Sequence, residues 1–168
     1  DLFRPAPRAF QQQLRRAEKA IAEEDYRSAV VLLGAVLTGQ TPDPDLAEIQ
    51  QDYFVTGDGE TKHRTSIRAE ALRLLGAMPA EGRQWYELKF GTEAAQIMKR
   101  AVAEGDLGAL HDVTRKYFHT QAGYDAALLV GRRQLDRGHP LAAALSLKRL
   151  YDVPHARSRF EPTLSLLL

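Results

Sequence analysis

The sequence predicts an all-α fold in which antiparallel helical hairpins stack as a solenoid. Within 123–154, apolar residues recur at steps of three and four in two successive stretches, which is the spacing of an amphipathic helix. Gly138 and Pro140 separate these stretches. Glycine after a helix end and proline at the next helix start are typical of the turn in a hairpin. The same order, an amphipathic helix, a turn and a second amphipathic helix, recurs elsewhere in the chain. This recurrence indicates an array of helical hairpins.

The composition is that of a soluble globular domain. The chain has 168 residues, of which 44% are hydrophobic and 27% charged, enough for one domain with a real core. Its 23 basic and 22 acidic residues create no large field that would attract nucleic acid or an anionic membrane. Cysteine is absent, which excludes disulfides, thiolate metal ligands and cysteine nucleophiles. No apolar run is long enough to span a bilayer, so we expect no membrane insertion.

The first hairpin is expected over residues 8–38. The pattern predicts one helix that stops near Asp25 and a second that ends at Gly39. The predicted inward residues are Phe10, Leu14, Ala17 and Ile21 in the first helix, and Tyr26, Ala29, Leu33 and Leu37 in the second.

Residues 40–66 break the helical pattern and predict a loop-rich insertion. Prolines and aspartates punctuate 42–45, and VTGDGETKHRTS at 55–66 is polar and contains glycine. Between these two stretches, Leu46 to Phe54 has the spacing of a short helix.

Residues 67–168 restore helical spacing. The first helix of this part runs from Ile67 to Met78 and is stopped by Pro79. The segment QWYELKF at 84–90 fits a short helix or a strand, and we favour the helix. Because 164–168 is apolar and resembles the start of another helix, the sequence predicts a single helical-repeat domain over 1–168 that continues beyond Leu168.

A third hairpin is predicted between the first hairpin and 123–154. Thr92 is expected to cap its first helix, Gly105 to end that helix, and Asp106 to cap the second, which runs to about Phe118. Thr120 then caps the helix that follows. The predicted inward residues are Ala95, Met98, Val102, Leu110, Val113, Thr114 and Tyr117 in this hairpin, and Tyr124, Leu128, Gly131, Leu135, Ala143, Leu147 and Leu150 in 123–154.

Two features resemble the tetratricopeptide repeat (TPR), a helical hairpin of about 34 residues. The segment AEEDYRSAV at 22–30 resembles the start of the second helix of such a unit. Gly131, Ala143 and Pro154 are spaced like the small-residue and proline positions of the family. The resemblance implies a TPR-like α-solenoid. Because glycine inside a helix costs about 1 kcal/mol relative to alanine, we expect Gly131 to mark a close helix crossing.

A second resemblance covers about half of the chain, from Ile67 to Leu150. The motifs that carry it are RLLGAMP at 73–79, WYELKFG at 85–91, YFHTQAGYDAA at 117–127 and LDRGHPLAAAL at 135–145. This region resembles the helical domain ahead of PQQ-like β-propeller repeats in large bacterial envelope proteins similar to outer-membrane assembly lipoproteins. The resemblance implies a domain in the bacterial cell envelope or periplasm, with a propeller beyond Leu168. A cytoplasmic location stays open, and neither a catalytic residue nor a cofactor comes with the resemblance.

The residues predict no catalytic, cofactor-binding or metal site. The five histidines, at 63, 111, 119, 139 and 155, form no HExxH motif and no pair at ligand spacing. We expect His119 to make a local hydrogen bond that organises the turn between two hairpins. Asp58 and Glu60 are fragments of a calcium-loop pattern, which a plain loop explains better.

The predicted function is therefore a non-catalytic protein–protein interaction or scaffold module. In a stacked array the first helices line a concave face that binds a peptide or a partner domain, here including the chain's own C-terminal propeller. Among the candidates, Arg132 is the strongest because a guanidinium can hold a carboxylate with two hydrogen bonds. The candidate partner-binding residues are Gln96, Lys99, Asp125, Leu128, Leu129, Arg132 and Asp136.

Two alternatives stay open at this point. The chain could be the accessory domain of a PQQ-like propeller oxidoreductase, in which case the chemistry would lie in the propeller. It could also be a helical-repeat RNA binder, because basic residues after Lys99 often come in pairs. We favour a protein or peptide partner over nucleic acid because the charges balance.

Overall fold

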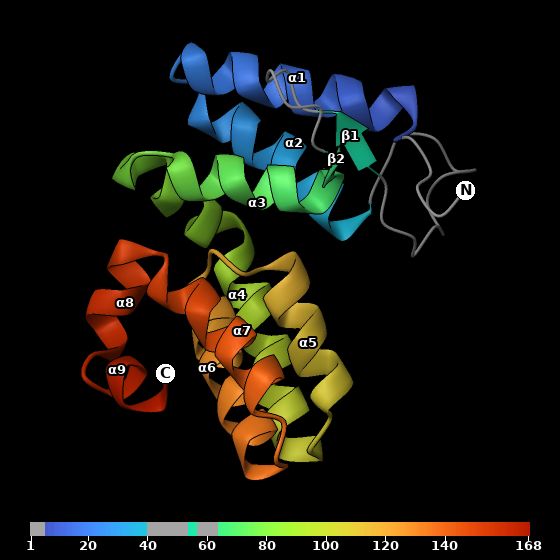
Figure 1. Cartoon of the computed structure of the whole chain (residues 1–168). Helices are drawn as coiled ribbons and strands as arrows, with labels where there is room; N and C mark the ends of the chain where they lie inside the picture. The colour runs from blue at the N-terminus through green and yellow to red at the C-terminus, as the bar shows by residue number, and fades with distance from the viewer. Residues whose placement is uncertain (1–5, 40–53, 57–63) are drawn as a thin grey trace. The chain divides into compact units, whose positions relative to one another are not determined.

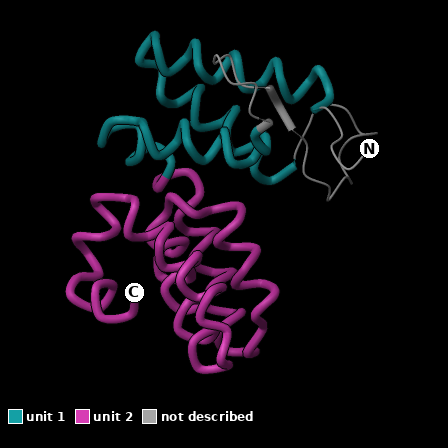
Figure 2. Tube along the Cα trace, viewed as in Figure 1, with its two compact units in different colours: residues 1–86 teal, residues 87–168 magenta. Residues whose placement is uncertain are grey.

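The computed structural model describes residues 6–39, 54–56 and 64–168, and these residues form nine helices and one pair of short strands (Figure 1). The predicted α-helical class is confirmed for this part of the chain. The chain divides into two compact units, Asp1–Tyr86 and Glu87–Leu168 (Figure 2). The division falls inside helix α4 (Ala80–Glu104).

Unit 1 begins with the predicted hairpin. Helix α1 (Arg8–Ala22) packs against α2 (Tyr26–Thr38). The carboxylate of Asp25 caps α2 by accepting a hydrogen bond from the Ser28 amide at 3.1 Å. The helix ends at Gly39, whose positive φ of 75° is the left-handed conformation that glycine adopts without strain. The prediction of a hairpin over 8–38 is confirmed.

Two strands lie in the part of 40–66 for which the sequence predicted a loop. Strand β1 (Phe54–Thr56) pairs antiparallel with β2 (Arg64–Ser66), with Val55 opposite Thr65. Strands of three residues are too short to produce a readable alternation of apolar and polar positions, so the pattern missed them. Of the short helix expected at Leu46 to Phe54, residues 46–53 lie outside the described residues, and Phe54 lies in β1.

Helix α3 (Ile67–Ala77) follows β2 directly and packs against α1 and α2. The Ser66 hydroxyl caps it by accepting a hydrogen bond from the Ala69 amide at 3.3 Å. Its inward residues are Ile67, Ala71 and Leu75, which completes the core of unit 1.

Helix α4 corrects the prediction of two helices separated at Gly91 and Thr92. The helix runs unbroken from Ala80 to Glu104. A Cβ atom on Gly91 would lie 2.3 Å from the Glu87 carboxylate, so this glycine makes room for a side chain one turn earlier and does not end the helix. Thr92 is an exposed residue in the middle of the helix and caps nothing.

The predicted inward stripe of this helix is also wrong. Ala95 and Val102 are exposed, and Met98 is half-buried. The prediction assumed that the helix begins at Thr92. The buried positions were therefore assigned to the wrong side of the helix. The residues buried on α4 in unit 2 are Phe90, Ala94 and Ala101.

The remaining turns of unit 2 follow the prediction. Gly105 has a φ of 69°, and the Asp106 carboxylate caps α5 (Leu107–Lys116) by accepting a hydrogen bond from the Ala109 amide at 3.0 Å. Helices α6 (Gln121–Asp136) and α7 (Pro140–Tyr151) form the next hairpin.

Two short helices complete unit 2. Helix α8 (Pro154–Phe160) packs against α7 and against α9 (Thr163–Leu167). We call residues 154–168 the C-terminal arm. The core of unit 2 is made by side chains from α4 to α9. Its larger members include Phe90, Leu110, Val113, Val130, Leu147, Leu150 and Leu164.

Candidate protein-interaction surface

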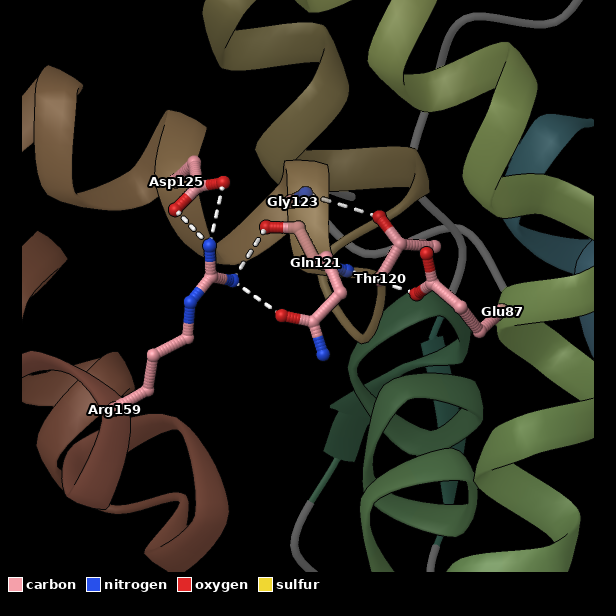
Figure 3. A network of polar contacts seen from close by, with 6 residues as sticks. All are labelled: Glu87, Thr120, Gln121, Gly123, Asp125 and Arg159. Atoms are coloured by element: carbon pink, nitrogen blue, oxygen red, sulfur yellow. Dashed lines mark hydrogen bonds and ion pairs between the residues drawn. The ribbon is translucent and has the colours of Figure 1, made fainter.

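The start of α6 is fixed by two side-chain caps. The Thr120 hydroxyl accepts a hydrogen bond from the Gly123 amide at 2.9 Å, as the sequence predicted. The Glu87 carboxylate of α4 accepts one from the Gln121 amide at 2.8 Å (Figure 3). Both acceptors satisfy amides that have no partner inside the helix, and the carboxylate also suits the positive end of the helix dipole. The position of α6 relative to α4 is therefore well defined.

Gly123 is required at this position. A Cβ atom there would lie 2.0 Å from the backbone oxygen of Tyr117 and 2.6 Å from that of Phe118. These are backbone atoms, which cannot rotate out of the way. The turn between α5 and α6 therefore lies directly against the first turn of α6.

A buried tyrosine links α6 to this turn and to the C-terminal arm. The Tyr124 hydroxyl lies 3.1 Å from Nδ1 of His119 and 2.7 Å from Nε2 of His155 in α8. The ring of Phe118 meets the Tyr124 ring edge to face at 5.4 Å. The local hydrogen bond predicted for His119 is thus confirmed, and His155 acquires a partner 31 residues away.

Arg149 of α7 also contacts this aromatic group. Its guanidinium lies 4.3 Å from the centre of the Phe118 ring, a cation–π contact, and donates to the Thr114 carbonyl at 3.4 Å. Desolvation lowers the pKa of Arg149 from its usual value. Sequence reasoning missed this contact, because nothing in the local pattern distinguishes Arg149 from the other basic residues of the helix.

The five candidate residues of α6 share one side of that helix, which we call the α6 face: Asp125, Leu128, Leu129, Arg132 and Asp136. Arg132 and Asp136 are exposed, while both leucines are half-buried. The residues that α6 buries in the core lie on other sides of the helix, among them Ala127 and Gly131. The structure therefore groups the α6 candidates as predicted.

The other two candidates lie on α4. Gln96 and Lys99 are both exposed. Helical spacing puts them on the side of α4 away from its buried residues Ala94 and Ala101. They form a separate pair and are not part of the α6 face.

Asp125 is already engaged by the chain's own C-terminal arm. Nη2 of Arg159 lies 2.9 Å and 3.0 Å from the two carboxylate oxygens of Asp125. Nη1 of the same guanidinium donates to the side-chain oxygen of Gln121 and lies 3.5 Å from its backbone oxygen (Figure 3). The N-terminal end of the α6 face is therefore occupied, while Arg132 and Asp136 face solvent.

Helix α7 exposes two leucines that sequence reasoning did not select. Leu141 is 74% exposed and Leu145 is 61% exposed. They lie one turn apart, on the side opposite the buried Ala143 and Leu147. Sequence reasoning had no signal for them, because exposed leucines are common on helix surfaces.

Two further kinds of feature were sought among the described residues, a metal-binding cluster and a membrane-spanning helix. Among them, no group of three histidine, aspartate or glutamate side chains is arranged to hold a metal ion. None of their helices has the length and apolar character needed to cross a membrane. The fragmentary calcium-loop residues Asp58 and Glu60, and His63, lie outside the described residues.

Comparison of the chain with protein-family models, with curated protein sequences and with solved structures found no match. The likeness to the TPR and to the helical region ahead of PQQ-like propeller repeats therefore stays a prediction from sequence motifs. All seven candidate partner-binding residues lie in unit 2, and five of them form the α6 face.

Proposed function

We propose that this chain is a non-catalytic protein-interaction module, with TPR-like stacking of its helical hairpins, that binds a peptide or partner domain on the α6 face. The observation that carries the proposal is the composition of this face. Two half-buried leucines, Leu128 and Leu129, lie beside two exposed charges, Arg132 and Asp136. Binding surfaces commonly combine an apolar centre with a polar rim in this way.

Each part of the α6 face has a definite role in this proposal. The leucines supply apolar area that a partner removes from water, at roughly 25 cal/mol per Å². Arg132 supplies the specific contact, because its planar guanidinium can hold a partner's carboxylate with two hydrogen bonds. Asp136 lies one helical turn after Arg132. Its negative charge disfavours an acidic group of the partner at that position.

The scaffold supports such a role because the face lies on a fixed helix. Two caps hold the N-terminal end of α6, Thr120 and Glu87, and its middle crosses α7 at Gly131. A preorganised surface loses little conformational entropy when it binds. The bacterial envelope is the proposed setting, and the motif resemblance described above is the ground for it.

Site-specific photo-crosslinking tests the proposal. A benzophenone amino acid is placed at position 132 of the full chain, and at position 137 in a matched control, in cells that naturally make the protein. Arg137 is also exposed but lies at the C-terminal end of α6, off the α6 face. We expect a discrete protein adduct from position 132 and a much weaker one from position 137. Equal adducts from both positions, or none from position 132, would refute the proposed surface.

A further inference from the structure

We propose that Gln121 and Asp125 form an arginine-binding slot, filled at rest by Arg159 of the chain's own C-terminal arm, so that the arm competes with an arginine-bearing partner segment. This inference deepens the proposed function and rests on it, since the slot is the N-terminal end of the α6 face.

The geometry of the slot selects arginine. One guanidinium nitrogen contacts both carboxylate oxygens of Asp125, and the other contacts the side-chain oxygen of Gln121 (Figure 3). The two contacts need two nitrogens held in one plane. A lysine has a single nitrogen and cannot reproduce them together.

The contact between Arg159 and Asp125 is accessible to a competitor. The side chain of Arg159 is 40% exposed and that of Asp125 is 35% exposed. Water already reaches the pair, so a competing guanidinium can approach Asp125 without first entering the core of unit 2. Exposed ion pairs also contribute little to stability, which makes replacement by a partner feasible.

The arm is built as a separate small body. The Glu161 carboxylate accepts hydrogen bonds from Arg157 in α8 at 3.2 Å, and from the hydroxyl and amide of Ser165 in α9 at 2.9 Å and 3.3 Å. These contacts tie the two helices of the arm to each other. An arm joined in this way can leave α6 and α7 as a unit.

The arm is attached to the rest of unit 2 through two buried side chains and through polar contacts. The buried residues are Ala156 in α8 and Leu164 in α9, and His155 and Arg159 make polar contacts with α6. Helices of seven and five residues are too short to be stable when detached. The arm is therefore expected to open at a lower free energy than α6 and α7, as weakly packed segments do.

The slot and Arg132 together define the partner. Asp125 and Arg132 are seven residues apart on α6, which corresponds to about 10 Å along the helix. A partner segment that uses both carries an arginine for the slot and a carboxylate about 10 Å away.

The test uses a fluorescent synthetic peptide with the sequence of residues 153–168 as the probe, and the full chain as the receptor. The receptors are the unchanged chain, Arg159→Ala, the same change combined with Asp125→Asn, and Arg137→Ala as a matched control at an exposed arginine. Binding is measured by fluorescence anisotropy. We expect Arg159→Ala to bind the peptide up to about fivefold more tightly than the unchanged chain, which is the upper end of what an exposed pair contributes.

The remaining variants distinguish a specific effect at the slot from a non-specific weakening of the arm's attachment. Adding Asp125→Asn should cancel the gain, Arg137→Ala should show none, and a peptide with lysine in place of Arg159 should bind more weakly. Equal binding to the unchanged chain and to Arg159→Ala, or equal binding of the arginine and lysine peptides, would overturn the slot. Because the assay needs no partner protein, its failure is distinct from a failure of the crosslinking test.

Hydrogen exchange provides an independent measurement. In the unchanged chain, amides of α8 and α9 should exchange faster than those of α7, and Arg159→Ala should accelerate the arm alone. If the arm exchanges as slowly as α7, it does not detach, and the proposed competition is refuted.

Discussion

Gly131 of α6 lies against Leu147 of α7, so closely that a Cβ atom on the glycine would be 2.7 Å from both Cγ and Cδ2 of the leucine. Leu147 is fully buried, so its side chain cannot turn out into solvent without leaving the core. The absence of a side chain at Gly131 therefore sets the separation of the two helices at this point. The prediction of a close crossing at Gly131 is confirmed, and it fixes the hairpin that carries the α6 face.

Substitution of Gly131 by leucine should destabilise unit 2. The added side chain would push α7 away from α6, and overpacking of this kind costs about 1 to 3 kcal/mol. The free energy of unfolding from urea titration measures the loss. Ala144→Leu adds similar bulk at an exposed position of α7 and should change the stability little. An unchanged stability in the Gly131 variant would contradict the crossing described above.

Substitution of Gly123 by alanine should be more harmful, although it adds a single methyl group. That methyl would meet the backbone oxygen of Tyr117 at 2.0 Å, so the turn between α5 and α6 would have to move. We expect a loss of about 3 kcal/mol, at the upper end of the range for overpacking. Gly108→Ala, where the nearest atom is a side-chain oxygen at 3.2 Å, is the control. Similar stabilities for the two variants would show that the turn is not held as described.

Tyr117 should lose its phenolic proton at a higher pH than an ordinary tyrosine. Desolvation, with a smaller effect from a hydrogen bond to Glu93, raises the pKa of Tyr117 to about 12. The folded state therefore favours the neutral phenol. Its contribution to stability is fully present below the ordinary tyrosine pKa of about 10 and is lost as the pH rises from about 10 towards 12.

Ultraviolet titration of the phenolate band measures this late ionisation. One of the six tyrosines should ionise with a midpoint near 12, and Tyr117→Phe should remove that phase. If the Tyr117→Phe chain keeps the phase, the shifted group is another tyrosine.

Glu161 links the arm's two helices in a pH-dependent way. Hydrogen bonding to Ser165, and then to Arg157, lowers the pKa of Glu161. A lowered carboxylate pKa adds stability above the ordinary glutamate pKa of about 4.3, and this stability is lost as the pH falls through the lower, folded-state value. The Ser165 amide resonance should follow this titration by NMR, with a midpoint below 4.3. Glu161→Gln should abolish it, and an ordinary midpoint would mean that the Ser165 contacts are not formed in solution.

The structural features that could be predicted are those set by residues close together in the sequence. The hairpin at 8–38, the caps at Asp106 and Thr120 and the crossing at Gly131 all follow from local spacing and cap chemistry, and the structure has them. The α6 face was also predictable, because helical periodicity alone groups its residues.

The features that the sequence did not predict depend on residues far apart in the chain. Arg159 meets Asp125 across 34 residues, and Glu87 caps Gln121 across the same separation. No local pattern encodes such a pair. The cap predicted at Thr92 is absent, because a threonine inside a helix and a threonine that caps one cannot be told apart from the local sequence.

The affinity of the chain for the partner identified by crosslinking tests the central claim most directly. Two charge reversals are compared, Arg132→Glu on the α6 face and Arg137→Glu at the residue directly after α6, so that the change in net charge is the same. We predict that Arg132→Glu raises the dissociation constant at least tenfold, which corresponds to about 1.4 kcal/mol, while Arg137→Glu changes it less than twofold. Circular dichroism should show the same helix content in both. Equal effects of the two reversals, or none from Arg132→Glu, would contradict the assignment of the α6 face as the binding surface.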